Sequence, residues 1–148
     1  MQQAVRYDGW SIITGMDFRE KLVIRDPTQE KISNPDYDKC DPQSQQKIYP
    51  PKDLTDWDAK MDIRVGNGSN TGLVKSLSVG SGITIGTPDP VDGTIELFID
   101  NTETKSAPII DSAGKSVYFD LFLIPPTPAD NQRVIYGSIK IIQAVTDV

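Results

Sequence analysis

The sequence contains no histidine and only one cysteine, Cys40. Histidine is the commonest general base, the commonest metal ligand and the usual partner of a nucleophilic serine or cysteine. A single cysteine excludes an intramolecular disulfide and a zinc cage built from cysteines. The sequence pattern also marks no pair of acidic residues for acid–base chemistry. We therefore expect no catalytic residues, no bound metal and no cofactor, and we predict that the chain is not an enzyme.

Long apolar runs and clusters of basic residues are also missing. No run approaches the roughly 20 apolar residues of a membrane-spanning helix, and the polar residues Met1–Asp8 do not resemble a secretory signal. The formal charge is −6, from 15 basic and 21 acidic residues. Binding to a phosphate backbone needs clustered basic side chains, whereas those of this chain are scattered singly. We expect neither a membrane nor a nucleic acid as partner, and we expect a protein that matures in a cytoplasm.

Instead of long apolar runs, the sequence contains short stretches in which apolar and polar residues alternate. They predict roughly seven or eight strands, separated by turns rich in glycine and proline. The clearest alternation places Trp57, Ala59, Met61, Ile63 and Val65 on one buried face. We predict an all-β fold in which residues 1–148 form a single immunoglobulin-like or Greek-key β-sandwich. The expected strands are 10–14, 18–25, 57–65, 73–79, 83–85, 94–99, 117–124 and 133–142.

The last two of these strands predict a hairpin that closes the sandwich. Alternation along 117–124 places Tyr118, Asp120 and Phe122 on the face opposite Phe119 and Leu121. A glycine inside the final strand, Gly137, indicates a bulge or the close approach of a neighbour. The glycine-rich segments 66–70 and 80–82 lack the following helix of a phosphate-binding loop, so we interpret both as hairpin turns.

Residues 26–56 form a long polar insertion between two strands. Five prolines interrupt the segment, and it follows neither the period of a strand nor that of a helix. Two interpretations remain open: a mobile insertion, or an extended arm that becomes ordered on a partner. Its acidic residues Asp36, Asp38 and Asp41 indicate a solvated loop, because a calcium loop would add a glycine and a terminal glutamate. The candidate subunit contacts are its apolar residues Ile32, Tyr37, Ile48 and Tyr49.

The order of the motifs resembles a known family. Residues 53–55 lead into the strand 59–64, Gly82–Ile85 and Gly93–Leu97 follow, and 118–123 and 133–141 complete the pattern. Over residues 17–146 this resembles the small β-sandwich domain of tailed-bacteriophage virion proteins, and it is similar to the N-terminal domain of siphophage upper baseplate proteins. The chain departs from that pattern in the extra residue before Asp120, in its longer insertion, and in having no visible receptor-binding domain.

The resemblance implies a structural protein of a phage virion, assembled in the host cytoplasm in many symmetric copies. Its partners would be other virion proteins: tail, fibre or coat subunits. The first hypothesis is a tail, baseplate or fibre-adaptor subunit that acts through protein–protein contacts. The alternatives are a capsid decoration protein and a non-enzymatic module that binds carbohydrate or protein.

Overall fold

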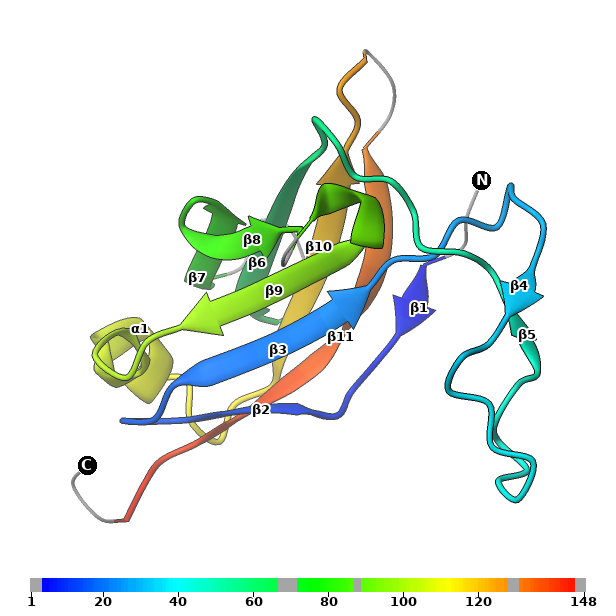
Figure 1. The fold of residues 1–148 in the computed structure, drawn as a ribbon. Coiled ribbons are helices and arrows are strands. Elements are labelled where there is room, and N and C mark those ends of the chain that lie inside the picture. The colour runs from blue at the N-terminus through cyan, green and yellow to red at the C-terminus, as the bar shows by residue number, and fades with distance from the viewer. Residues whose placement is uncertain (1–3, 67–71, 87–88, 128–130, 146–148) are drawn as a thin grey trace.

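A computed structural model of the chain describes residues 4–66, 72–86, 89–127 and 131–145. Within these residues nine strands form one curled sheet, in the order β1-β11-β10-β6-β7-β8-β9-β3, and β2 also pairs with β11 (Figure 1). The strands of this sheet are β1 (Val5–Arg6), β2 (Trp10–Ile13), β3 (Phe18–Val23), β6 (Asp58–Val65), β7 (Leu73–Val79), β8 (Gly82–Ile85), β9 (Thr94–Ile99), β10 (Val117–Ile124) and β11 (Gln132–Ile142).

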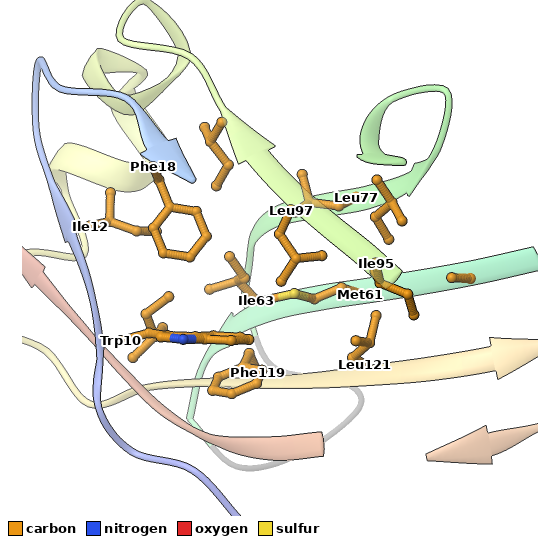
Figure 2. Packing of buried hydrophobic residues seen from close by; sticks show 14 of the residues in the cluster. Trp10, Ile12, Phe18, Met61, Ile63, Leu77, Ile95, Leu97, Phe119 and Leu121 are labelled. Carbon is orange, nitrogen blue, oxygen red and sulfur yellow. The ribbon is translucent and has the colours of Figure 1, made fainter. Parts of the chain in front are cut away.

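The sheet curls so that β3 and β9 lie over β6 and β10, with the core between them (Figures 1 and 2). This arrangement confirms the prediction of an all-β, sandwich-like fold. The predicted hairpin is also present, because β10 and β11 pair antiparallel. Successive side chains of a pleated strand point to opposite faces, so two facing layers of sheet can enclose one apolar core between them.

The inward faces follow the alternation of the sequence. On β6, Ala59, Met61 and Ile63 are buried, whereas Trp57 just before the strand and Val65 at its end are half-buried. On β10 every odd-numbered residue from Val117 to Leu123 is buried, and the even-numbered residues are partly exposed. Since side chains alternate between the two faces of a strand, a slip of one residue would exchange the apolar and charged faces.

Aromatic residues from distant parts of the sequence meet at one end of the core (Figure 2). Trp10 of β2 stacks on Phe119 of β10, with ring centroids 4.8 Å apart, and meets Phe18 edge-on at 6.1 Å. Such ring pairs contribute about 0.5–1.5 kcal/mol beyond the area that they bury. They tie the start of the chain to the β10–β11 hairpin.

The strand β1 was not expected from the sequence, because it is only two residues long. It runs parallel to β11, and the amide of Tyr7 donates to the carbonyl oxygen of Tyr136 at 2.8 Å. The segment passes directly over Gly137. A Cβ atom on this glycine would lie 2.7 Å from the carbonyl carbon of Tyr7 and 2.8 Å from Oδ1 of Asp8. The predicted close approach at Gly137 is therefore confirmed.

The segment at residues 80–82 is not the hairpin turn that we predicted. β7 and β8 pair in parallel over Ser78 and Val79, so the chain bends without reversing its direction. The segment at 66–70 lies, apart from Gly66, outside the described residues. Helical structure in the described chain is short: two 3₁₀ turns, η1 (Pro90–Asp92) and η2 (Glu103–Lys105), and one helix, α1 (Ala107–Ile110). None of these described helices has the length and apolar character that crossing a bilayer requires.

The insertion is more regular than its sequence indicated. Two strands, β4 (Ile32–Ser33) and β5 (Lys47–Ile48), pair antiparallel and form an isolated two-stranded sheet. An isolated bridge joins Arg25 to Pro51 nearer the body. Residues 24–52 therefore form a β-ribbon, which projects from the body on the side of β1 (Figure 1).

The base of the ribbon belongs to the body. The amide of Ile24 donates to Gly93, and the amide of Lys52 donates to Ile24. Gly93 is buried there with a φ of 67°, and a Cβ atom would lie 2.5 Å from the Ile24 carbonyl oxygen. Leu54, inside the predicted insertion, is fully buried in the core. The insertion as predicted, 26–56, thus includes a short C-terminal part that packs with the sandwich.

Candidate functional site

The outer face of β6, β10 and β11 carries acidic, basic and aromatic side chains together. It is hollowed by a cavity of about 610 Å³, and a second hollow of about 210 Å³ shares three of its residues. Period-2 geometry aims alternate side chains of the three strands at this face, because their other side chains fill the core. The charged and aromatic side chains that line the two hollows include Lys60, Asp62, Arg64, Tyr118, Asp120, Phe122, Arg133 and Tyr136.

Strand register arranges these side chains in rows. Asp120 of β10 lies opposite Asp62 on β6 and opposite Tyr136 on β11. One step along, Phe122 lies opposite Lys60 on one side and Arg133 on the other. The register with β11 shifts between Leu121 and Phe122, so that Arg133 rather than Val134 faces Phe122. Sequence alternation placed Asp120 and Phe122 on one face, but it did not reveal their neighbours.

The two carboxyl groups have different surroundings. Asp62 accepts a hydrogen bond of 2.7 Å from the hydroxyl of Ser76 and one of 3.3 Å from the Arg64 guanidinium. Among the described residues, no group donates a hydrogen bond to the Asp120 carboxylate. Burial raises the pKa of Asp120 above its usual value of 3.8, and the nearby carboxylate of Asp62 adds to the increase. Arg133 and Arg64 oppose that increase without cancelling it.

Asp8, at the edge of the same face, shows the opposite effect. Its carboxylate accepts a 2.7 Å hydrogen bond from the amide of Ser138 and pairs with Arg6 at 3.0 Å. These donors stabilise the ionised form, so they lower the pKa of Asp8 below 3.8. The two aspartates therefore provide a matched pair for testing the electrostatics of this face.

Replacing Asp120 with asparagine is expected to raise the melting temperature at pH 7. A carboxyl group whose pKa is raised by folding stabilises the fold fully only below its unfolded pKa, and it loses that contribution as the pH rises through its folded pKa. Asparagine removes the unfavourable negative charge. The gain should therefore shrink as the pH falls below the usual value of 3.8. Thermal melts of the wild type and the variant between about pH 3 and pH 7 measure this difference.

Asp8→Asn is the control with the opposite sign. Its lowered pKa stabilises the fold above the unfolded pKa, and that contribution disappears as the pH falls through the folded value. This variant should melt below the wild type at pH 7, and the two should converge in acid. If both variants moved the melting temperature in the same direction at pH 7, the assigned surroundings of Asp120 would be wrong.

The four predicted contact residues lie along the ribbon and are accessible. Ile32 is 45% exposed, Tyr37 43% and Tyr49 38%, and Ile48 is half-buried. Ile32 and Ile48 face each other across the two strands. The ammonium of Lys31 lies 5.0 Å from the centre of the Tyr49 ring. The ribbon thus brings Ile32, Ile48 and Tyr49 near one another, while Tyr37 lies further out, beyond β4.

The acidic residues of the ribbon support its turns. Asp38 accepts a hydrogen bond from the amide of Cys40, and Asp41 accepts one from the amide of Gln43, both at 2.9 Å. Side chains of aspartate commonly close loops in this way. Within the described residues, no three acidic or cysteine side chains gather as a metal site would require.

Neither tryptophan provides the exposed aromatic platform of a carbohydrate-binding module. Trp10 is buried in the core, and Trp57 is half-buried beneath the ammonium of Lys52, which lies 4.9 Å from its ring. The partly exposed aromatic residues of the outer face are Tyr118, Phe122 and Tyr136 instead. Strand alternation alone indicated the outward position of the first two.

No family model matches the chain, and no curated protein has a significantly similar sequence.

Proposed function

We propose that this chain is a structural subunit of a bacteriophage virion, in the tail, the baseplate or a fibre adaptor, and that it acts through protein–protein contacts. The observation that carries the proposal is the β-ribbon. From Pro27 to Ile48 no residue is buried, and only Asn34, Ser44 and Ile48 are half-buried. The resemblance of the sequence to phage virion domains is the reason for proposing a virion as the assembly in which the ribbon makes its contacts.

A ribbon of this kind is suited to binding another protein. An isolated two-stranded ribbon is marginally stable in water, because it buries little apolar surface. This one exposes Ile32, Tyr37 and Tyr49 and projects away from the body (Figure 1). A partner surface would bury these side chains and offset the entropy lost when the ribbon is held in one conformation. The body holds the base of the ribbon through the hydrogen bond from Ile24 to Gly93 and through the buried Leu54 that follows the ribbon.

The proposal is tested by the composition of purified particles. Mass spectrometry of phage particles from cells that express this chain should detect it in stable association with virion proteins. A tail or baseplate subunit would be present in a low copy number set by the symmetry of the tail. A capsid decoration protein would instead be present in proportion to the coat protein. Absence of the chain from intact particles would refute both forms of the proposal.

Replacing residues 31–47 with a short Asn-Gly turn should leave the body folded but reduce incorporation into particles. The bridge between Arg25 and Pro51 lies nearer the body and is kept, and Asn-Gly favours a tight hairpin. Circular dichroism and thermal melting report folding, and quantitative mass spectrometry reports incorporation.

The matched variant for this test keeps the backbone of the ribbon and changes three side chains to serine: Ile32, Tyr37 and Tyr49. It should lose incorporation as the deletion does, if the exposed apolar side chains make the contact. Normal incorporation of both variants would show that the ribbon has no part in assembly.

A carbohydrate-binding module is the second candidate, and the hollowed outer face favours it. Sugars are commonly held by aromatic rings together with charged hydrogen-bonding groups, and Tyr118, Tyr136 and Asp120 line the same cavity. A glycan array gives the test. Specific binding that is lost in Tyr136→Ala would support this candidate, and the absence of any binding would remove it.

A further inference from the structure

One row of the outer face combines an aromatic ring with two positive charges. Phe122 of β10 lies between Lys60 of β6 and Arg133 of β11 in the strand register. Neither cation has an ion pair within the described residues, although the Arg133 guanidinium stacks on the Tyr136 ring at 4.2 Å. In a chain with a net charge of −6, this row places two cations on either side of an apolar ring, although carboxylates stand in the adjacent rows of the same face.

The ribbon carries the complementary pattern in three consecutive residues. Asp36, Tyr37 and Asp38 place an aromatic ring between two carboxylates, and all three residues are exposed. Asn34 accepts a hydrogen bond from the amide of Asp36, and the Asp38 carboxylate accepts one from Cys40, so both flanks of the turn are held in shape. Because residues 35–43 are all exposed, the turn does not rest on the outer face of its own chain.

We propose that the Asp36–Tyr37–Asp38 turn of one copy docks on the Lys60–Phe122–Arg133 row of a second copy. The proposal rests on the proposed function, and it names the partner of the ribbon as another molecule of the same chain. Each carboxylate would pair with a cation, while Tyr37 packs against Phe122. Opposite charges on the two surfaces align them and disfavour other registers.

The neighbouring row limits where the turn can bind. Asp62 and Asp120 lie one step from the docking row on one side, and the exposed Asp58 lies one step from it on the other, so carboxylates on both sides would repel the acidic turn. The turn is therefore confined to the single row that holds the two cations. Asp62 is already paired with Arg64, which reduces that repulsion on the β6 side.

Two copies can make this contact twice about a twofold axis, each docking its turn on the row of the other, and they then form a closed dimer. Where the copies do not exchange turns in this way, each still offers one free turn or one free row after it binds a neighbour. Contacts of this kind generate a ring when the rotation between copies closes, and a filament when it does not. A single small contact is weak, but a closed ring gains from several contacts made together.

Exchange of charge between the two surfaces tests the proposal. The face variant carries Lys60→Glu and Arg133→Glu, and the turn variant carries Asp36→Lys and Asp38→Lys. Changing both residues of each pair makes the test independent of which carboxylate meets which cation. Sedimentation velocity over a range of concentrations should show association of the wild type that weakens with added salt.

Each variant alone should remain monomeric, because its altered surface repels the unaltered one. An equimolar mixture of the two should associate again. The acidic turn of the face variant meets the unchanged basic row of the turn variant. The basic turn of the turn variant meets the acidic row of the face variant. A chain with all four substitutions should also self-associate. Circular dichroism confirms folding of each variant. A monomeric wild type, or variants that associate as well alone as mixed, would overturn the proposal.

Cross-linking from the ribbon gives an independent measurement. Cys40 is exposed two residues beyond Asp38, and it is the chain's sole cysteine. A photoactivatable maleimide attached there should yield cross-links to residues 58–64, 118–124 or 132–136 of a second, isotopically labelled copy. Cross-links confined to the maleimide-bearing molecule's own chain, or to other strands, would contradict the docking.

The two proposals fail in distinguishable ways. If the wild type is monomeric while the chain is found in purified particles, the ribbon binds a different virion protein, and only the self-docking proposal is wrong. If the chain self-associates by charge exchange but is absent from particles, the proposed function is wrong and the docking geometry stands.

Discussion

Replacing Ile63 with alanine is expected to lower the free energy of unfolding by about 2–5 kcal/mol. Ile63 is fully buried at the centre of β6, between β7 and β10 in the sheet, and beneath Leu97 of β9 in the core (Figure 2). Alanine would remove apolar contacts and leave a cavity, because the strands on either side are held by their own hydrogen bonds. Chemical denaturation followed by circular dichroism measures the change.

Lys60→Ala on the same strand is the control. Its side chain points to the outer face and is exposed, so the free energy of unfolding should change by about 0.5 kcal/mol or less. Both residues lie on β6 and therefore within the same ladder of backbone hydrogen bonds. Equal and small effects at both positions would mean that the inner face of β6 has been assigned wrongly.

Replacing Gly137 with alanine should lower the free energy of unfolding by about 1–3 kcal/mol. Its added methyl group would meet the backbone of Tyr7, which cannot move aside as a flexible side chain would, and it would also press on the carboxylate of Asp8. The N-terminal segment would have to shift away from β11. That shift would weaken the hydrogen bonds from Tyr7 to Tyr136 and from Ser138 to Asp8.

Gly72→Ala is the matched control, because no atom lies within 4 Å of the Cβ position there. It should change stability by about 0.5 kcal/mol or less. Hydrogen exchange of the Tyr7 and Ser138 amides separates a local effect from a global one. Faster exchange of these two amides is expected in Gly137→Ala even under conditions where the core remains folded. Unchanged exchange and unchanged stability would contradict the close approach.

Strand alternation predicts the core of this protein well. The inner faces of β6 and β10 follow directly from the sequence, because apolar residues recur at every second position along most of each strand. The same reasoning fails for β1, where two residues cannot show a period. It also fails for Leu54, an isolated apolar residue between polar neighbours that the fold nevertheless buries.

The outer face shows why a site is harder to predict than a core. Alternation places Asp120 and Phe122 outward, but their neighbours depend on which strands pair and in which register. The shift between Leu121 and Phe122 brings Arg133 beside the ring, and no local pattern signals it. The ribbon could not be predicted from the sequence for the same reason. Its two strands pair residues such as Ile32 and Ile48 across a polar, proline-interrupted loop.

The parallel pairing of β1 and β2 with β11 also has a kinetic consequence. Asp8 and Ser138 are 130 residues apart in sequence, yet the Asp8 carboxylate accepts a hydrogen bond from the Ser138 amide. During synthesis Trp10 therefore has no Phe119 to stack on until most of the chain has left the ribosome. Folds dominated by such distant pairings cross their barrier slowly, on the order of milliseconds to seconds. The edges of β6 and β10 stay open to wrong pairing in that interval, and rapid dilution from denaturant should favour aggregation unless the chain is kept dilute.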